Sequence, residues 1–345
     1  MKENRTLFIG NLAVRIPVIQ GGMGVGISLS ALAGSVAQCG GVGILSAAQI
    51  GFRDPGWERD PVETNLRVLR EEIGKAKDIA EGGVIGVNIM VATRFYERYV
   101  RAAVEAGADL IISGAGLPVE LPALAGSAKI APIVSTLKSF QVISGYWKKK
   151  YNRNPDLVVI EGPLAGGHLG FKKEELTDIE ALCYEKEVER IIGCVREMET
   201  DTHIPVAVAG GIYSGADAVQ VATRFVTTYE CDADVRYKES YIRAKKEDIE
   251  IVESPVGMPG RAIHNSFLDE VRERRLPVEK CHQCLAKCNR QEIPYCITDA
   301  LVQAARGNTQ KGLLFCGANA YRAQKLEHVS DIMKEFEEEL SCRQE

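Results

Sequence analysis

The sequence predicts an α/β fold, a closed (β/α)8 or TIM barrel, followed by a helical, cysteine-rich extension. Eight short apolar segments are spaced along the first two thirds of the chain, and most are separated by segments with helical periodicity. Such alternation is typical of a parallel sheet, and eight units favour a closed barrel over the alternative, an open doubly wound sheet. We therefore assign residues 1–228 to the barrel and 229–345 to an extension that packs on it.

The apolar segments define the expected strands. We place them at residues 16–20, 42–46, 84–89, 110–113, 130–135, 157–161, 204–209 and 218–223. The helices are expected at 28–38, 65–81, 94–106, 119–126, 139–151 and 178–199, and in the extension at 237–246, 263–273, 297–306 and 329–340. Ser28 or Ser30 is the expected N-cap of the first helix. Glycine-rich loops follow several strands, at the barrel face where active sites assemble.

One connection is too short for this pattern. Only six residues, Ile212 to Asp217, separate Gly211 from the last strand, whereas a parallel crossover usually needs a dozen or more. Either the barrel has lost a helix here, or residues are absent from the sequence between Ser214 and Asp217. We favour the second explanation and expect a further mobile segment of about ten residues, the crossover minimum. An intact mass equal to the 37.7 kDa of the chain would contradict it.

Composition narrows the class of protein. The chain of 345 residues is 46% hydrophobic and 26% charged, which suits a globular protein with a large core. Its net charge is −5 and no basic stripe is present, so we expect no nucleic-acid partner. No apolar run reaches the length of a membrane span, and the N-terminus lacks the apolar core of a signal peptide. We therefore expect a cytoplasmic protein without a membrane partner.

The stretch Glu161-Gly-Pro-Leu-Ala-Gly-Gly-His-Leu-Gly170 is the strongest functional signal. It follows a buried strand, and its glycines allow the backbone to approach a bulky flat ligand. His168 can exchange a proton near neutral pH. The alternative is a tight turn with a surface histidine, but its position just past a strand end favours a catalytic role. The glycine-rich loop at 20–26 does not match the dinucleotide-binding fingerprint, which argues against a Rossmann dehydrogenase.

Five segments resemble the nitronate monooxygenase (2-nitropropane dioxygenase) family, whose superfamily includes the FMN-dependent enoyl-acyl-carrier-protein reductases. The matching segments are Pro17–Gly24, Gly86–Asn88, Glu161–Gly170, Ala209–Ile212 and Ala222–Phe225. The resemblance covers residues 10–275 and implies a TIM barrel that holds non-covalent FMN.

The resemblance also implies roles for individual residues. His168 would be catalytic, either as the base that removes a proton next to a nitro group or as an acid or electrostatic partner in enoyl reduction. The backbone of Gly210, Gly211, Ala222 and Thr223 would hold the FMN phosphate, as expected for loops after strands seven and eight. The other cofactor residues would be Gly22, Met23, Asn88, Lys138, Glu161, Gly166 and Gly167. For Lys138, a lysine at a helix end with no cofactor role is about as good an interpretation.

Four of the ten cysteines, Cys281, Cys284, Cys288 and Cys296, lie within sixteen residues. Their spacing resembles the [4Fe–4S] ligation of some other FMN barrels, although it differs from the bacterial ferredoxin pattern. Thiolates also bind zinc, and His282 could replace one of them. The spacing leaves three possibilities open for these cysteines: an iron–sulfur cluster, a zinc ion, or no metal at all.

Three functions follow, in order of preference. The first is an FMN-dependent oxidation of small nitroalkanes or nitronates by O2. The second is an NAD(P)H-dependent reduction of enoyl thioesters, in which Lys148–Lys150 and Lys172–Lys173 would dock an acidic carrier protein. The third is a non-catalytic flavin or iron–sulfur redox sensor. The partners would be a small molecule or an acyl thioester, and the sequence leaves open whether the chain forms a homodimer.

Overall fold

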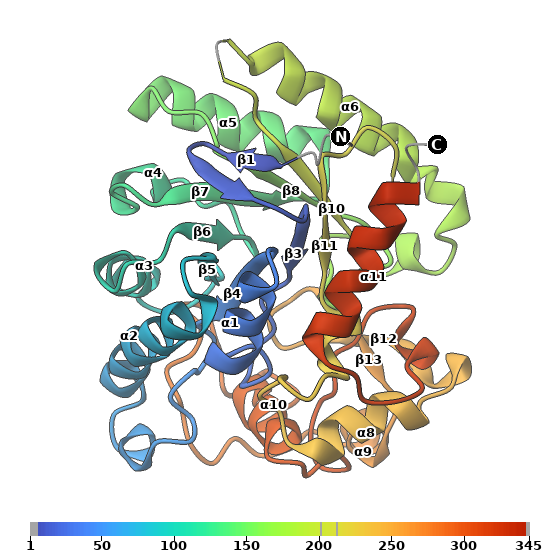
Figure 1. Ribbon diagram of the computed structural model, residues 1–345. Coiled ribbons are helices and arrows are strands. Elements are labelled where there is room, and N and C mark those ends of the chain that lie inside the picture. Colours follow the sequence, from blue (N-terminus) through green and yellow to red (C-terminus); the bar gives the residue numbers. More distant parts are fainter. Residues whose placement is uncertain (1–5, 201, 212, 343–345) are drawn as a thin grey trace.

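A closed barrel of eight parallel strands forms the body of the molecule, as the sequence predicts (Figure 1). The computed structural model describes residues 6–200, 202–211 and 213–342. Neighbouring strands pair in chain order, and the last pairs with the first through Val219 and Val18. The barrel strands are β3 (Val18–Gln20), β4 (Val42–Ser46), β5 (Val84–Asn88), β6 (Leu110–Ser113), β7 (Lys129–Val134), β8 (Val158–Glu161), β10 (Val206–Ala209) and β11 (Ala218–Val221).

Helices surround the strands. The first six lie at the expected places, with ends that differ by a few residues, whereas the seventh was not predicted. They are α1 (Ser30–Gln38), α2 (Pro61–Ala80), α3 (Tyr96–Glu105), α4 (Leu121–Leu124), α5 (Leu137–Tyr151), α6 (Tyr184–Met198) and α7 (Thr223–Val226). The helix expected at 178–199 begins only at Tyr184, because short 3-10 turns precede it. No helix within the described ranges is long and apolar enough to cross a membrane.

The predicted N-cap of α1 is wrong. Neither Ser28 nor Ser30 caps the helix; Leu29 occupies the N-cap position and makes no side-chain cap. Instead Asp232, about two hundred residues further along the chain, accepts hydrogen bonds from the backbone N–H groups of Leu29 and Leu32. A carboxylate at a helix N-terminus satisfies free N–H groups and interacts favourably with the helix dipole. The cap is therefore a tertiary contact that joins the barrel to the extension.

A hairpin that the sequence reading missed closes the N-terminal end of the barrel. Strands β1 (Leu7–Ile9) and β2 (Leu12–Val14) pair antiparallel. Leu7, Ile9 and Val14 are buried in the same apolar cluster as the inward-facing residues of the barrel strands. This cluster keeps that end of the barrel packed and leaves the opposite end for the site.

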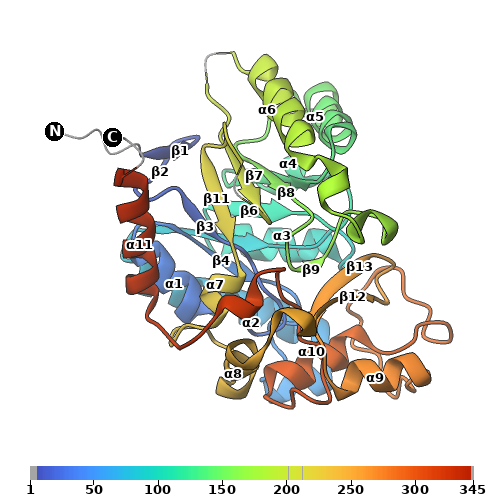
Figure 2. The same ribbon diagram turned by 90° about the vertical axis from the view of Figure 1, so that its right-hand side faces the viewer.

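The extension is more than helical, which corrects the prediction. It contains α8 (Val235–Arg243), α9 (Ser266–Glu273), α10 (Ile297–Ala305), α11 (Val329–Cys342) and a hairpin of β12 (Ile249–Glu253) and β13 (Pro259–Ile263). Figure 2 shows α8, α9, α10 and the hairpin gathered beside one end of the barrel, whereas α11 runs along its flank next to α1. The hairpin also pairs with β9 (Gly167–His168), a short strand in the loop that follows β8.

The short connection between β10 and β11 is made without a helix. Ala207 pairs with Ala218, and Asp217 N donates to Val206 O. A four-residue strand spans only ~13 Å, whereas eight residues, 210–217, can extend to ~26 Å. Eight residues can therefore return the chain along β10, so the prediction that they cannot is wrong. The described parts of β10 and β11 pair without an additional segment. Ile212 lies outside the described residues.

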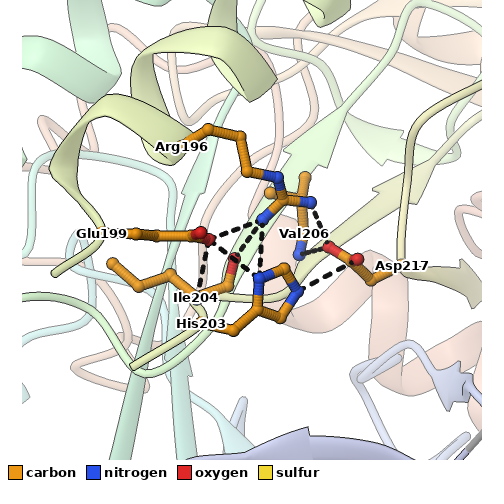
Figure 3. Close-up of polar contacts among 6 residues, drawn as sticks. All are labelled: Arg196, Glu199, His203, Ile204, Val206 and Asp217. Carbon is orange, nitrogen blue, oxygen red and sulfur yellow. Dashed lines mark hydrogen bonds and ion pairs between the residues drawn. The ribbon is translucent and has the colours of Figure 1, made fainter. Parts of the chain in front are cut away.

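A polar network fixes this return (Figure 3). Asp217 accepts hydrogen bonds from Val206 N at 2.8 Å and from Arg196 Nη2 at 2.7 Å, and its other oxygen lies 3.1 Å from His203 Nε2. Glu199 accepts from Arg196 and from Ile204 N. One carboxylate thus holds the start of β10 and the start of β11 together, which replaces part of the support that a crossover helix would give.

We predict that Asp217→Ala lowers the free energy of unfolding by about 1–3 kcal/mol, because the backbone N–H of Val206 loses its partner and Arg196 keeps only Glu199 of its two carboxylates. Urea denaturation monitored by circular dichroism measures the loss. Glu71→Ala is the control: its surface pair with Arg67 is worth at most about 0.5 kcal/mol. Equal losses in both variants would contradict the role given to Asp217.

Candidate active site

A cavity of about 950 Å³ opens at the C-terminal ends of the barrel strands. Parallel barrels place their active sites at this end, because the βα loops meet there. Its lining includes glycines from four of these loops: Gly21, Gly22, Gly24, Gly114, Gly166, Gly167, Gly210 and Gly211. Side chains that reach the same space include those of Asn88, Glu161, His168 and Gln220. The lining is therefore mostly backbone and apolar groups with a few polar side chains.

Two of the glycines are required by close contacts. A Cβ on Gly22 would lie 2.4 Å from Cβ of Asn88, well inside van der Waals distance. Gly210 has φ +69°, and a Cβ there would lie 2.4 Å from Ala165 N. Side chains at these positions would push the loops apart. The glycines thus bring the loops together and leave an open, flat-walled space.

The structure brings together all but one of the residues expected at the site. His168, Gly22, Met23, Asn88, Glu161, Gly166, Gly167, Gly210, Gly211, Ala222 and Thr223 all line the cavity. Lys138 does not: its side chain is exposed near the start of α5, outside the cavity lining, as the alternative interpretation of a helix-end lysine expects.

His168 is held in place by the extension. Its backbone pairs with Gly260 of β13, and its Nε2 lies 2.7 Å from Oγ of Ser254, in the turn between β12 and β13. Phe315 packs edge-on against the ring, with centroids 4.9 Å apart. Nδ1 has no hydrogen-bond partner among the described residues. The imidazole is thus oriented through one nitrogen and leaves the other for a ligand.

Burial lowers the pKa of His168 to about 4. The ring is therefore neutral across the physiological range, and a neutral imidazole has a lone pair that can accept a proton. Ser254 was not foreseen from the sequence. It lies 86 residues from His168 and has no motif of its own, so no local signal could have identified it.

Glu161, at the end of β8, is the second titratable group in the cavity. Burial raises the pKa of its carboxyl to about 8, and no charged partner offsets this shift. The carboxyl is thus mostly protonated at neutral pH and can donate a hydrogen bond. A neutral acid and a neutral base therefore share one enclosed space.

Gln220 is a further site residue that the sequence reading missed. Its side chain lines the cavity, and its Oε1 is buried without a hydrogen-bond partner. A buried unpaired carbonyl costs roughly 1–3 kcal/mol, which a ligand N–H would relieve. The signal was present in the sequence, because Gln220 is the one polar residue in the apolar run 218–222.

The cavity continues beyond the barrel mouth into the extension. Residues 315–320 and 322–325 contribute to its wall, and so does Phe336 of α11. Gly317 N donates to Oγ1 of Thr223, and a Cβ on Gly166 would lie 2.6 Å from Gly317 N. This part of the extension therefore lies directly on the loops that the sequence identified. The site belongs to both parts of the chain.

Comparison with known proteins points to one family. The family model described as nitronate monooxygenase matches residues 5–339. A probable nitronate monooxygenase from Staphylococcus saprophyticus is 23% identical over 303 residues, which cover 78% of this chain and 81% of that protein.

Solved structures share the fold. FabK from Thermotoga maritima superposes with a TM-score of 0.68 at 23% identity, covering 96% of both chains. Nitroalkane oxidase from Streptomyces ansochromogenes gives a TM-score of 0.69 at 20% identity, covering 95% of this chain and 96% of that one. At these identities the likeness shows the architecture.

The raised pKa of Glu161 predicts a pH dependence of stability. The folded chain keeps this proton between about pH 4.5 and 8 while the unfolded chain releases it, so stability falls as pH rises toward 8. The lowered pKa of His168 has the opposite effect: it makes stability rise with pH, but only between about pH 4 and 6.5. From pH 6.5 to 8, Glu161→Gln should remove about 1 kcal/mol of the decline measured by urea denaturation.

Surface variant Glu105→Gln, whose parent carboxylate pairs with Arg70, is the matched control and should keep the wild-type decline. A Glu161→Gln variant with the same pH dependence as wild type would refute a protonated Glu161.

Proposed function

Because the chain belongs to the nitronate monooxygenase family, a family of flavin-dependent oxidoreductases, we propose that it uses FMN to oxidise small nitroalkanes or nitronates with O2. The observation that carries this proposal is the neutral His168, oriented by Ser254 beside a glycine-lined cavity. Oxidation of a nitroalkane begins with loss of a proton next to the nitro group, and a positioned neutral imidazole suits that step.

The cavity fits FMN on three counts. Its volume and glycine lining suit a flat ring system. The unpaired Oε1 of Gln220 offers an acceptor for a flavin N–H, and Asn88 and protonated Glu161 offer further polar contacts. When bound, FMN would supply the electron acceptor, while the protein supplies position and proton transfer.

The phosphate of FMN would lie at the loops after β10 and β11. We assign it to the backbone of Gly210, Gly211, Ala222 and Thr223, all of which line the cavity. The hydroxyl of Thr223 accepts a hydrogen bond from Gly317 N, so the extension steadies this loop. Backbone N–H groups can bind phosphate without a positive side chain. Arg224 is therefore not needed for this task, and its charge is already paired with Glu327 and Glu335.

In the proposed reaction, Nδ1 of His168 accepts the substrate proton while Nε2 stays hydrogen-bonded to Ser254. The buried wall around His168 keeps bulk water from competing for the proton. Protonated Glu161 can donate to a negative oxygen of the substrate or cofactor. The low pKa of His168 makes it a weak base, and the charge that develops on it must be balanced by the negative charge on the nitronate.

The alternative is an NAD(P)H-dependent reduction of enoyl thioesters. The cavity lining favours it: Arg322 and Lys325 contribute to the wall, where Arg322 could meet a phosphate of a long substrate, while Lys325 is shared with Glu327. Two of the five expected docking lysines are engaged in ion pairs. Lys150 is bonded to Glu120, and Lys173 to Glu253, so much of their charge is already neutralised.

Two assays on one flavin-loaded preparation separate these functions. We expect O2 consumption with a small nitronate, and no substrate-dependent oxidation of NADH or NADPH with an enoyl thioester. His168→Ala should lower kcat by about 10²–10⁴-fold, the range for loss of a general base, with the flavin spectrum unchanged. Enoyl reduction without nitronate turnover would reverse the assignment, and no turnover of either substrate would favour the redox sensor.

Ser254→Ala provides a second variant that leaves the imidazole in place. Without the hydroxyl the ring keeps its packing on Phe315 but loses its orienting hydrogen bond, so we expect a loss of about tenfold in kcat, with flavin binding retained. Ser240→Ala, on the exposed side of α8, is the matched control. Full activity of the Ser254 variant would mean that the hairpin does not position His168.

A further inference from the structure

His282 is buried in an arrangement that its own neighbours do not explain. Only 4% of the residue is exposed, yet its Nδ1 has no hydrogen-bond partner among the residues that the structure describes. A buried ring nitrogen without a partner costs free energy of desolvation that nothing in this structure repays. It lies far along the chain from the barrel motifs, and the proposed reaction does not use it.

The ring of His282 is fixed on two sides. Its Nε2 lies 2.6 Å from Oδ1 of Asp299, and its face stacks on Trp57, with centroids 4.4 Å apart and planes 9° from parallel. Trp57 is itself held by a hydrogen bond from Nε1 to Gln49. With Nε2–H donated to the carboxylate, the neutral tautomer has its lone pair on the unpaired Nδ1. A carboxylate that fixes one nitrogen of an imidazole is the usual support of a metal-binding histidine.

Thiols surround this imidazole. Among the described residues, one group of three metal-binding side chains has its ligand atoms within 4.8 Å of one another: His282, Cys296 and Asp299. Cys284 is two residues from His282 and is partly buried; burial, and then the nearby thiols Cys288 and Cys281, raise its pKa. Cys281 and Cys288 are exposed.

We propose that His282 Nδ1 and the thiolates of Cys284 and Cys296, with one of the exposed cysteines, bind a zinc ion. Three thiolates and one imidazole form a common structural zinc site, with Zn–S distances of about 2.3 Å and Zn–N distances of about 2.0 Å. Asp299 stays in the outer shell, hydrogen-bonded to Nε2. A four-thiolate iron–sulfur cluster would leave the buried Nδ1 unexplained, whereas a zinc site of three thiolates and one imidazole uses it.

The segment can close on an ion. In the part of the chain that the structure describes, neither the set His282, Cys284 and Cys296 nor any three of the four sulfur atoms have their ligand atoms within 4.8 Å of one another, so Cys284 and one exposed thiol must both move inward. Residues 281–296 contain turns and no helix or named strand. They are anchored near Cys284, where Arg94 N donates to its carbonyl and Leu285 bridges Thr93. Because α10 begins directly after Cys296 and its Leu301 lines the cavity, the ion would brace that wall.

The test is metal content, which does not depend on turnover. We expect about one zinc per chain, without acid-labile sulfide, in protein purified anaerobically and passed through a weak chelator. Cys296→Ser and His282→Asn should lower retained zinc at least tenfold, and Cys194→Ser on α6 should not. Cobalt(II) in place of zinc should give the strong visible and near-ultraviolet bands of tetrahedral thiolate ligation in wild type.

Asp299→Asn tests the site in a variant that should still fold, in case the ligand variants do not. It keeps the shape of the residue and should weaken zinc 10–100-fold in competition with a chromophoric chelator, with the circular dichroism spectrum unchanged. Wild-type protein that contains no zinc and takes up none would overturn the proposal. Iron with sulfide would equally overturn it, in favour of an iron–sulfur cluster in this segment.

Discussion

The pairing of β9 with β13 is the contact on which the site depends. Gly167 and His168 come from the loop after β8, and Arg261 and Gly260 come from the extension, yet they form one antiparallel ladder. Leu169 N donates to Pro259 O beside it, and the buried Arg261 guanidinium donates to Ala165 O. Backbone pairing fixes the loop without any particular side chain, which leaves the loop free to be mostly glycine. The histidine gains its orientation from Ser254 in the turn of the same hairpin.

This arrangement explains why the barrel and the extension act as one unit. A barrel alone would present a flexible glycine loop, because glycine loses much conformational entropy when it is ordered. The extension supplies the strand that orders the loop, the hydroxyl that holds His168 and the segment 316–317 that packs against Gly166. It also caps α1 through Asp232. The cost of ordering the loop that carries His168 is therefore met by contacts that are distant in sequence.

Enclosure also sets the chemistry. Desolvation favours the uncharged form of every titratable group, so it lowers the pKa of His168 and raises that of Glu161. The result is a base and an acid that are both neutral at the same pH in one cavity. Such a pair can exchange protons with a substrate directly, without hydronium or hydroxide from bulk water. Neither shift needs a specific charged partner; both follow from the burial of the two side chains.

The sequence by itself determined the eight strands, most of the helices and nearly all of the predicted cavity residues, because these features are local. Apolar runs and glycine loops record strand and turn preferences within a few residues, and the closed parallel barrel then places every strand end at the same face. Lys138 shows the limit of this reasoning: position near a strand end does not determine which way a helical side chain points.

Only the tertiary structure decided the rest. Ser254, Gln220, the Asp232 cap and the helix-free return at Asp217 depend on groups brought together from distant parts of the chain or on burial. A hydrogen bond across 86 residues leaves no periodic trace in either segment, and an unpaired buried atom is visible only when its surroundings are known. Local preferences therefore gave the scaffold, and long-range packing selected which polar groups face the cavity and which partners they keep.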